Sequence, residues 1–159
     1  MKRTLFLTAV LIAAVFAYPS NAQDNPFLGT WKLNLAKSKF EPGPAPKSMT
    51  RTITADGSGA KYSFEGVGAD GTPFAYSFST NYDGKDCPVT GTGTPGGADT
   101  ISLKRVSSHK TEGTLKKGGN EVGKVTAEVS KDGKVATVKG KGKTPDGKDS
   151  TTDSVYDKQ

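Results

Sequence analysis

Hydrophobic and polar residues alternate along most of this chain in stretches of about eight to ten residues. In Thr72–Asn81, for example, aromatic side chains occupy every second position between small polar ones. A period of two is that of a β-strand, whose successive side chains point to opposite faces of a sheet. The pattern therefore predicts an all-β protein.

About ten strands are predicted in this way. They are Leu28–Asn34, Ser48–Ala55, Ala60–Val67, Thr72–Asn81, Lys85–Thr90, Thr100–Val106, Lys110–Lys117, Glu121–Ser130, Lys134–Gly142 and Lys148–Asp157. The connection after the first strand contains Pro42, Pro44 and Pro46, which favour an extended, polyproline-like segment over a helix.

Turn signals separate these segments at intervals of about 11 to 14 residues. They are Asp56-Gly57, Asp70-Gly71, Asp83-Gly84, Gly96-Gly97, Ser107-Ser108, Gly118-Gly119-Asn120, Asp132-Gly133 and Asp146-Gly147. Such short connections join antiparallel neighbours, and closure of the meander removes its two unpaired edges. We therefore predict an antiparallel up-and-down β-barrel. A β-sandwich is the alternative, although its crossings usually need longer connections.

The first 22 residues have the pattern of a signal peptide. Lys2 and Arg3 precede an apolar run from Leu5 to Ala17, and small residues end at Ala22, where a signal peptidase would cut. The apolar run is too short to span a bilayer comfortably, which disfavours an uncleaved anchor. We expect an exported protein, periplasmic or secreted, with no transmembrane segment in the mature chain.

Residues 23–159 suit one domain. The lone Cys87 allows no intramolecular disulfide, so core packing must stabilise the fold. Of the 22 basic residues, Lys2 and Arg3 lie in the expected leader, which leaves 20 against 16 acidic residues. This excess is mild. It favours anionic surfaces and falls short of the basic patches of nucleic-acid binders, so no nucleic-acid partner is expected.

The motif G-x-W occurs once, at Gly29 and Trp31 on the first strand, and Trp31 is the only tryptophan. Here the chain resembles the calycins, which comprise the lipocalins and the intracellular fatty-acid-binding proteins. With its leader it looks like an exported lipocalin-like protein of bacteria. The resemblance implies a barrel whose structural Trp31 plugs one end and whose interior holds a small apolar or amphipathic molecule. The position at which fatty-acid-binding proteins hold the ligand carboxylate with an Arg is Ser154 here. Lipocalins stack a basic residue of the last strand over the tryptophan, a place open to Lys148 or Lys158.

Aromatic residues gather on one face of two consecutive predicted strands. They are Tyr62, Phe64, Phe74, Tyr76 and Phe78. This aromatic wall either fills the barrel or lines a cavity for an apolar ligand. The later strands place Ala127, Ala136, Gly140 and Gly142 toward the interior, which leaves either an open cavity or a barrel that has collapsed on itself.

Both arginines of the mature chain, Arg51 and Arg105, fall on apolar faces. An inward arginine is costly unless paired, so each is a candidate contact for a carboxylate or phosphate. Alternatively, each side chain reaches the barrel rim and water.

Lys139, Lys141 and Lys143 alternate along one strand and form an expected outward stripe. Such lysines discourage pairing between strand edges, or they contact anionic material of the cell envelope.

Residues for catalysis or metal binding are scarce. His109 is the only histidine and lies in an expected turn, so a metal site built on His and Cys clusters is not predicted. Cys87 is expected to be a half-buried filler residue. The sequence thus predicts an exported, non-catalytic binding protein without a cofactor. The alternative is an envelope interaction protein with a filled barrel that binds anionic surface material through its exterior lysines.

Overall fold

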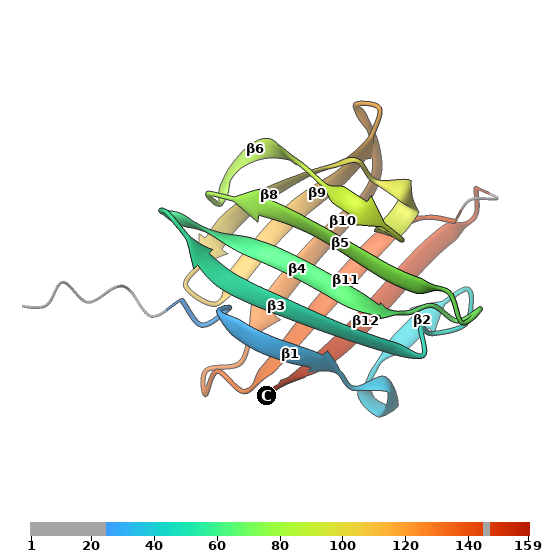
Figure 1. The fold of residues 1–159 in the computed structure, drawn as a ribbon, viewed down its shortest axis with the longest axis horizontal. Coiled ribbons are helices and arrows are strands. Elements are labelled where there is room, and N and C mark those ends of the chain that lie inside the picture. Colours follow the sequence, from blue (N-terminus) through green and yellow to red (C-terminus); the bar gives the residue numbers. More distant parts are fainter. Residues whose placement is uncertain (1–24, 145–146) are drawn as a thin grey trace, which may run out of the picture.

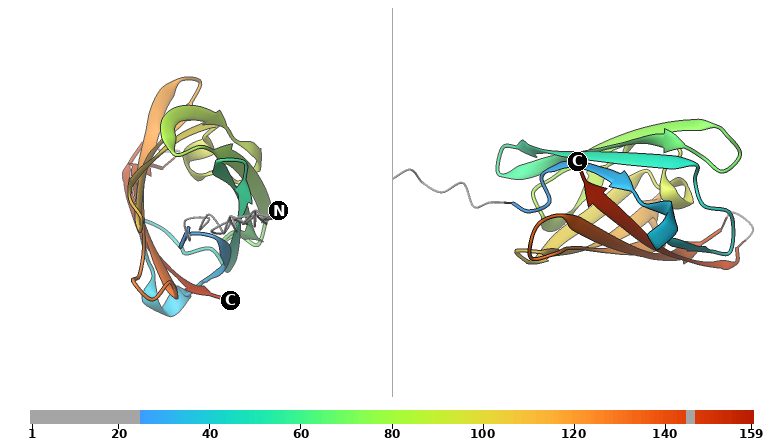
Figure 2. Two further views of the ribbon diagram at one scale, coloured as in Figure 1. Left: turned by 90° about the vertical axis from the view of Figure 1, so that its left-hand side faces the viewer. Right: turned by 90° about the horizontal axis from the view of Figure 1, so that it is seen from below.

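Antiparallel strands of a single sheet wrap around a common interior in the computed structural model, which describes residues 25–144 and 147–159. Figure 2 shows this interior from one end, with the earlier strands on one side and the later strands opposite. The expected signal peptide, residues 1–22, lies outside the described residues. The fold is the predicted all-β, up-and-down barrel, nearly closed.

Twelve strands form the sheet (Figure 1). They are β1 (Gly29–Leu33), β2 (Lys39–Glu41), β3 (Ser48–Asp56), β4 (Gly59–Val67), β5 (Pro73–Thr80), β6 (Asp83–Pro88), β7 (Thr90–Thr92), β8 (Thr100–Ser107), β9 (Lys110–Lys117), β10 (Asn120–Val129), β11 (Val135–Lys143) and β12 (Asp149–Lys158). Their order across the sheet is β6-β8-β9-β10-β11-β12-β1-β3-β4-β5-β7.

One expected strand is divided in two. The segment predicted as Lys85–Thr90 overlaps β6, which begins at Asp83 and pairs with β8, and includes the start of β7, which pairs with β5. Each of the other expected segments matches one observed strand, and the ends differ by at most one residue. The proline-rich connection is extended, as predicted, and adds the short strand β2, which pairs with β12.

The turn expected at Asp83-Gly84 was placed wrongly. The chain reverses at Asn81 and Tyr82, and Tyr82 has a positive φ of 57°. Its amide nitrogen donates to Thr80 Oγ1 over 3.0 Å, which stabilises this reversal. Gly84, with φ 78°, instead lies inside β6, where the register with β8 shifts between Asp83 and Asp86. The flexible glycine serves a bulge here.

One end of the barrel is closed by side chains. Register brings together the start of β1, the end of β3, the end of β10 and the start of β11. The residues packed there are almost completely buried, and they include Phe27, Trp31, Ile53, Val129 and Ala136. We call this region the closed end. Within the described residues, no helix is long and apolar enough to span a membrane.

Candidate ligand-binding cavity

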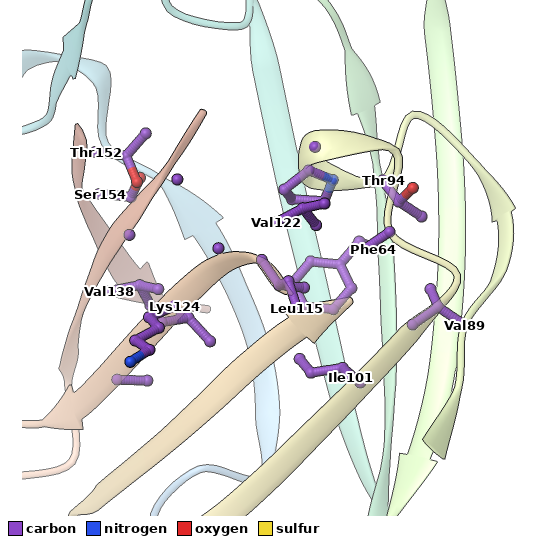
Figure 3. A pocket seen from close by; sticks show the side chains of 18 of the residues that line it. Phe64, Val89, Thr94, Ile101, Leu115, Val122, Lys124, Val138, Thr152 and Ser154 are labelled. Carbon is purple, nitrogen blue, oxygen red and sulfur yellow. The ribbon is translucent and has the colours of Figure 1, made fainter. Parts of the chain in front are cut away.

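A cavity of about 270 Å³ occupies the barrel interior next to the closed end. It extends toward the opposite end of the barrel, where the hairpins that join β9 to β10 and β11 to β12 lie. Figure 3 shows side chains from both sides of the barrel around this space, with Phe64 from β4 facing Leu115 from β9. The single-turn segment Pro95–Gly97 contributes to the lining at the same end.

Four members of the predicted aromatic wall line the cavity: Tyr62, Phe64, Tyr76 and Phe78. Pairing of β4 with β5 sets Tyr62 opposite Phe78 and Phe64 opposite Tyr76. The ring centroids of these pairs are 4.9 Å and 4.5 Å apart, and their planes are within 14° of parallel. Stacked cross-strand pairs of this kind stabilise the sheet and hold the rings in fixed positions.

Phe74 extends the aromatic wall without lining the cavity. Its ring centroid lies 6.2 Å from that of Tyr76. A Cβ added at Gly66 would lie 2.7 Å from Cζ of this ring, and one added at Gly93 would collide with Cβ of Phe74. Phe74 therefore packs against neighbouring backbone rather than in the cavity.

The wall opposite the aromatic residues contains several small residues. Gly123, Ala127, Gly140 and Gly142, from β10 and β11, all line the cavity, together with Val138. The glycines contribute no side chain to the space between these strands and the aromatic wall. Of the two outcomes left open by the sequence, the open cavity is the one observed.

Arg51 is buried beside this cavity. Only 3% of the residue is exposed, and it lines the cavity from β3. Its guanidinium carbon lies 4.6 Å from the ring centroid of Tyr156 and 5.6 Å from that of Trp31. The expectation that its head reaches water at the rim is therefore wrong. The cause is its register opposite Trp31, which places it next to the closed end.

Two nitrogens of this guanidinium, Nε and Nη2, are buried without a hydrogen-bond partner. Burial lowers the pKa of Arg51, because it removes the charged form from water. Burial also raises the pKa of Tyr62, Tyr76 and Tyr156, so these phenols are neutral at physiological pH.

Arg105 is partly buried at the closed end and does not line the cavity. Its guanidinium lies over the ring of Tyr82, 4.1 Å from the centroid. It donates to Asn25 Oδ1 over 3.1 Å and to the carbonyl oxygen of Ser108 over 3.3 Å. The two arginines are thus separated by the structure: Arg105 has partners at the closed end, whereas Arg51 faces the cavity.

Trp31 is completely buried at the closed end, and its indole nitrogen donates to the carbonyl oxygen of Phe27 over 2.9 Å. Lys158 Nζ lies 5.1 Å from the centre of its ring. Of the two lysines considered for this place, the structure therefore selects Lys158. Gly29 leaves room for that side chain, since a Cβ there would lie 2.8 Å from Lys158 Cε.

Several lining residues were not singled out from the sequence. The polar ones are Thr94, Thr111, Lys124, Ser150 and Thr152, and the apolar ones include Phe40, Met49 and Leu115. Alternation along β12, which places Ser150 and Thr152 on the same face as Ser154 and Tyr156, was a signal for two of them. Phe40 gave no such signal, because it reaches the cavity from the short strand β2.

The lysines of the expected stripe, Lys139, Lys141 and Lys143, are exposed. Lys143 Nζ lies 2.8 Å from Asp149 Oδ1, and Lys139 Nζ lies 3.8 Å from Asp153 Oδ2. Two of the three positive charges are therefore paired with carboxylates of β12.

His109 and Cys87 lie apart from the cavity lining. His109 forms the turn after β8, where its Nδ1 lies 2.9 Å from Ser108 Oγ. Cys87 is half-buried and packs against the core, as expected. In the part of the chain that the structure describes, no cluster of three His, Cys, Asp or Glu side chains is arranged to hold a metal ion.

Comparison with protein-family models finds none that matches the chain, and comparison with curated proteins finds no significantly similar sequence.

Proposed function

We propose that this protein is an exported, non-catalytic binding protein that holds a small apolar or amphipathic molecule inside a calycin-like barrel. The observation that carries the proposal is the cavity between the aromatic wall and the glycine-rich wall. Ligand pockets are typically apolar spaces with a few polar groups that orient the ligand. This cavity has that composition, with Arg51, Thr152 and Ser154 among aromatic and aliphatic side chains.

The lining favours binding over catalysis. Among the described residues around the cavity there is no carboxylate, imidazole or thiol. Its tyrosines have raised pKa values, because burial disfavours the phenolate. General acid–base catalysis needs a group whose pKa is close to the working pH, and none of these groups meets that requirement.

The cavity is tested by filling it. Val138→Phe adds an aromatic ring from β11 to the cavity lining. Thr137→Phe is the control, because it adds the same ring at the preceding residue, whose side chain points to the other face of the sheet. N-phenyl-1-naphthylamine, a neutral probe that fluoresces in apolar surroundings, should bind the wild type and the Thr137→Phe variant saturably. Val138→Phe should bind it much more weakly. Equal binding by all three proteins would place the probe outside the cavity and contradict the proposal.

Export has a separate test. The full chain is expressed in bacteria, and the protein in the periplasm and medium is weighed by native mass spectrometry. A chain that begins at Gln23 supports export, and an uncleaved protein in the cytoplasm contradicts it. An additional mass that is lost on organic extraction would identify the ligand class.

The alternative is binding to anionic envelope material through the exterior lysines. Exposure of Lys139, Lys141 and Lys143 favours it, although pairing of two of them with acids reduces the net charge of the stripe. Salt-sensitive binding to anionic vesicles that is abolished by Lys139→Glu together with Lys141→Glu would support this role. Vesicle binding unaffected by these changes would exclude it.

A further inference from the structure

Arg51, which lines the cavity, has buried hydrogen-bond donors without a partner. Buried polar side-chain atoms in proteins nearly always have a partner, and a buried charge without one is especially costly. Nε and Nη2 of Arg51 are both buried and both lack one, although the rings of Trp31 and Tyr156 lie against the guanidinium. Aromatic faces attract the cation but accept no conventional hydrogen bond from these N–H groups.

The two unpartnered nitrogens belong to the same edge of the guanidinium. Nε and Nη2 project their N–H bonds side by side, in the fixed fork that matches two oxygens of one carboxylate. The unused donors thus form one complete bidentate edge rather than two unrelated positions. An oxyanion with two oxygens would satisfy both donors at once.

The protein itself supplies no anion at this place. Among the described residues no Asp or Glu lines the cavity, whereas Arg51 and the exposed lysines Lys124, Lys141 and Lys143 do. The phenols nearest to Arg51 are neutral, as described above. The positive charge of Arg51 is therefore without a counter-charge in the cavity.

We propose that the ligand is a small organic anion whose carboxylate, or a similar oxyanion, accepts hydrogen bonds from Nε and Nη2 of Arg51 while its apolar body lies along the aromatic wall. This inference rests on the proposed function and specifies its ligand class. The cavity of about 270 Å³ lies just below the usual range of roughly 300–1,000 Å³, which favours a compact ring system or short chain. The proposed anion contact comes from β3, whereas fatty-acid-binding proteins hold the carboxylate with an Arg at the position that is Ser154 on β12 here.

The test compares two probes that share a ring system and differ in charge. 8-Anilinonaphthalene-1-sulfonate carries an oxyanion, and N-phenyl-1-naphthylamine lacks it. Each is titrated against the wild type, Arg51→Met and Lys158→Met. Lys158→Met is the matched control, because it removes one positive charge over the same Trp31 from a residue that does not line the cavity.

Arg51→Met should weaken binding of the anionic probe roughly ten- to hundredfold, as expected for loss of charge-assisted hydrogen bonds, and leave binding of the neutral probe within about twofold. Lys158→Met should leave both affinities nearly unchanged. If Arg51→Met affects both probes equally, or neither, the anion site is overturned while the cavity remains. If the wild type binds neither probe, the proposed function itself fails.

A measurement on the wild type alone covers the case in which Arg51→Met does not fold. Octanoate and octanol have the same chain length, and each is used to displace N-phenyl-1-naphthylamine. The proposal requires octanoate to compete at a concentration at least about tenfold lower than octanol. Equal or better competition by octanol overturns it.

Discussion

Gly29 determines how Lys158 reaches the buried Trp31. Its φ of 122° lies in a region that residues with a Cβ rarely adopt, and a Cβ there would lie 2.8 Å from Lys158 Cε. The glycine of the G-x-W motif thus permits both the backbone conformation and the packing of the lysine. Because Gly29 has no side chain, the ammonium group of Lys158 can lie over the indole ring of Trp31 and cover the closed end.

Gly29→Ala is therefore expected to lower the free energy of unfolding by about 1–3 kcal/mol, because it strains the backbone and displaces Lys158. Urea unfolding followed by Trp31 fluorescence measures the change. Lys158→Met should have a smaller effect in the Gly29→Ala background than in the wild type, since the contact is already lost. Gly118→Ala is the control: its φ is 56° and no atom lies within 4 Å of the added Cβ. Equal destabilisation by both alanines would contradict the role of Lys158.

Alternation with a period of two predicts which face of a strand an arginine occupies, but not which partners it has. Alternation placed both Arg51 and Arg105 on apolar faces, and both guanidinium groups do lie over buried or partly buried aromatic rings. It did not distinguish them. The partners of Arg105 are Asn25, 80 residues away in sequence, and the Ser108 carbonyl, and only the closed barrel brings Asn25 to it. Long-range contacts of this kind leave no local trace in the sequence.

At the scale of strands, the division between β6 and β7 interrupts closure. β5 is hydrogen-bonded to β7 only through Ala75–Ser77, and β6 pairs with β8 on its other side. The second half of β5 and the whole of β6 thus form a seam without ladder hydrogen bonds between them. Turn signals predicted the number of reversals well, but the partner of each strand half depends on the curvature of the whole sheet. At Asp83-Gly84, where a turn was predicted, the structure has a bulge in β6.

Backbone amides of β6 should exchange with solvent faster than those of β10. β6 has one pairing partner and a bulge, whereas β10 pairs along most of its length with β9 and β11. Strands with fewer protected hydrogen bonds open at lower free energy. Native-state hydrogen exchange followed by NMR measures both strands in one sample. Equally slow exchange in β6 and β10 would show that the seam is closed in solution.

Across the whole molecule, stability and the candidate site are divided between two regions. The closed end packs large side chains such as Phe27, Trp31 and Ile53 at close to zero exposure. The cavity region lacks that packing, because glycine and alanine face the aromatic wall across open space. The sequence indicated both walls through alternation. Whether they touch depends on the curvature of the barrel, which alternation does not specify.

Arg51 links these two regions, and its replacement should separate stability from binding. Arg51→Met removes two buried donors without partners, each costing about 1–3 kcal/mol, and loses cation–π contacts that contribute about 2 kcal/mol. The ligand-free variant should therefore be at least as stable as the wild type in thermal unfolding. An anionic ligand at a hundredfold excess over its Kd adds about 2.7 kcal/mol to the wild type. The same concentration should add much less to Arg51→Met. If the ligand-free variant were instead less stable than the wild type by about 3 kcal/mol or more, Arg51 would have to be assigned to the packing of the closed end. A residue kept for ligand binding is not expected to stabilise the fold when the cavity is empty.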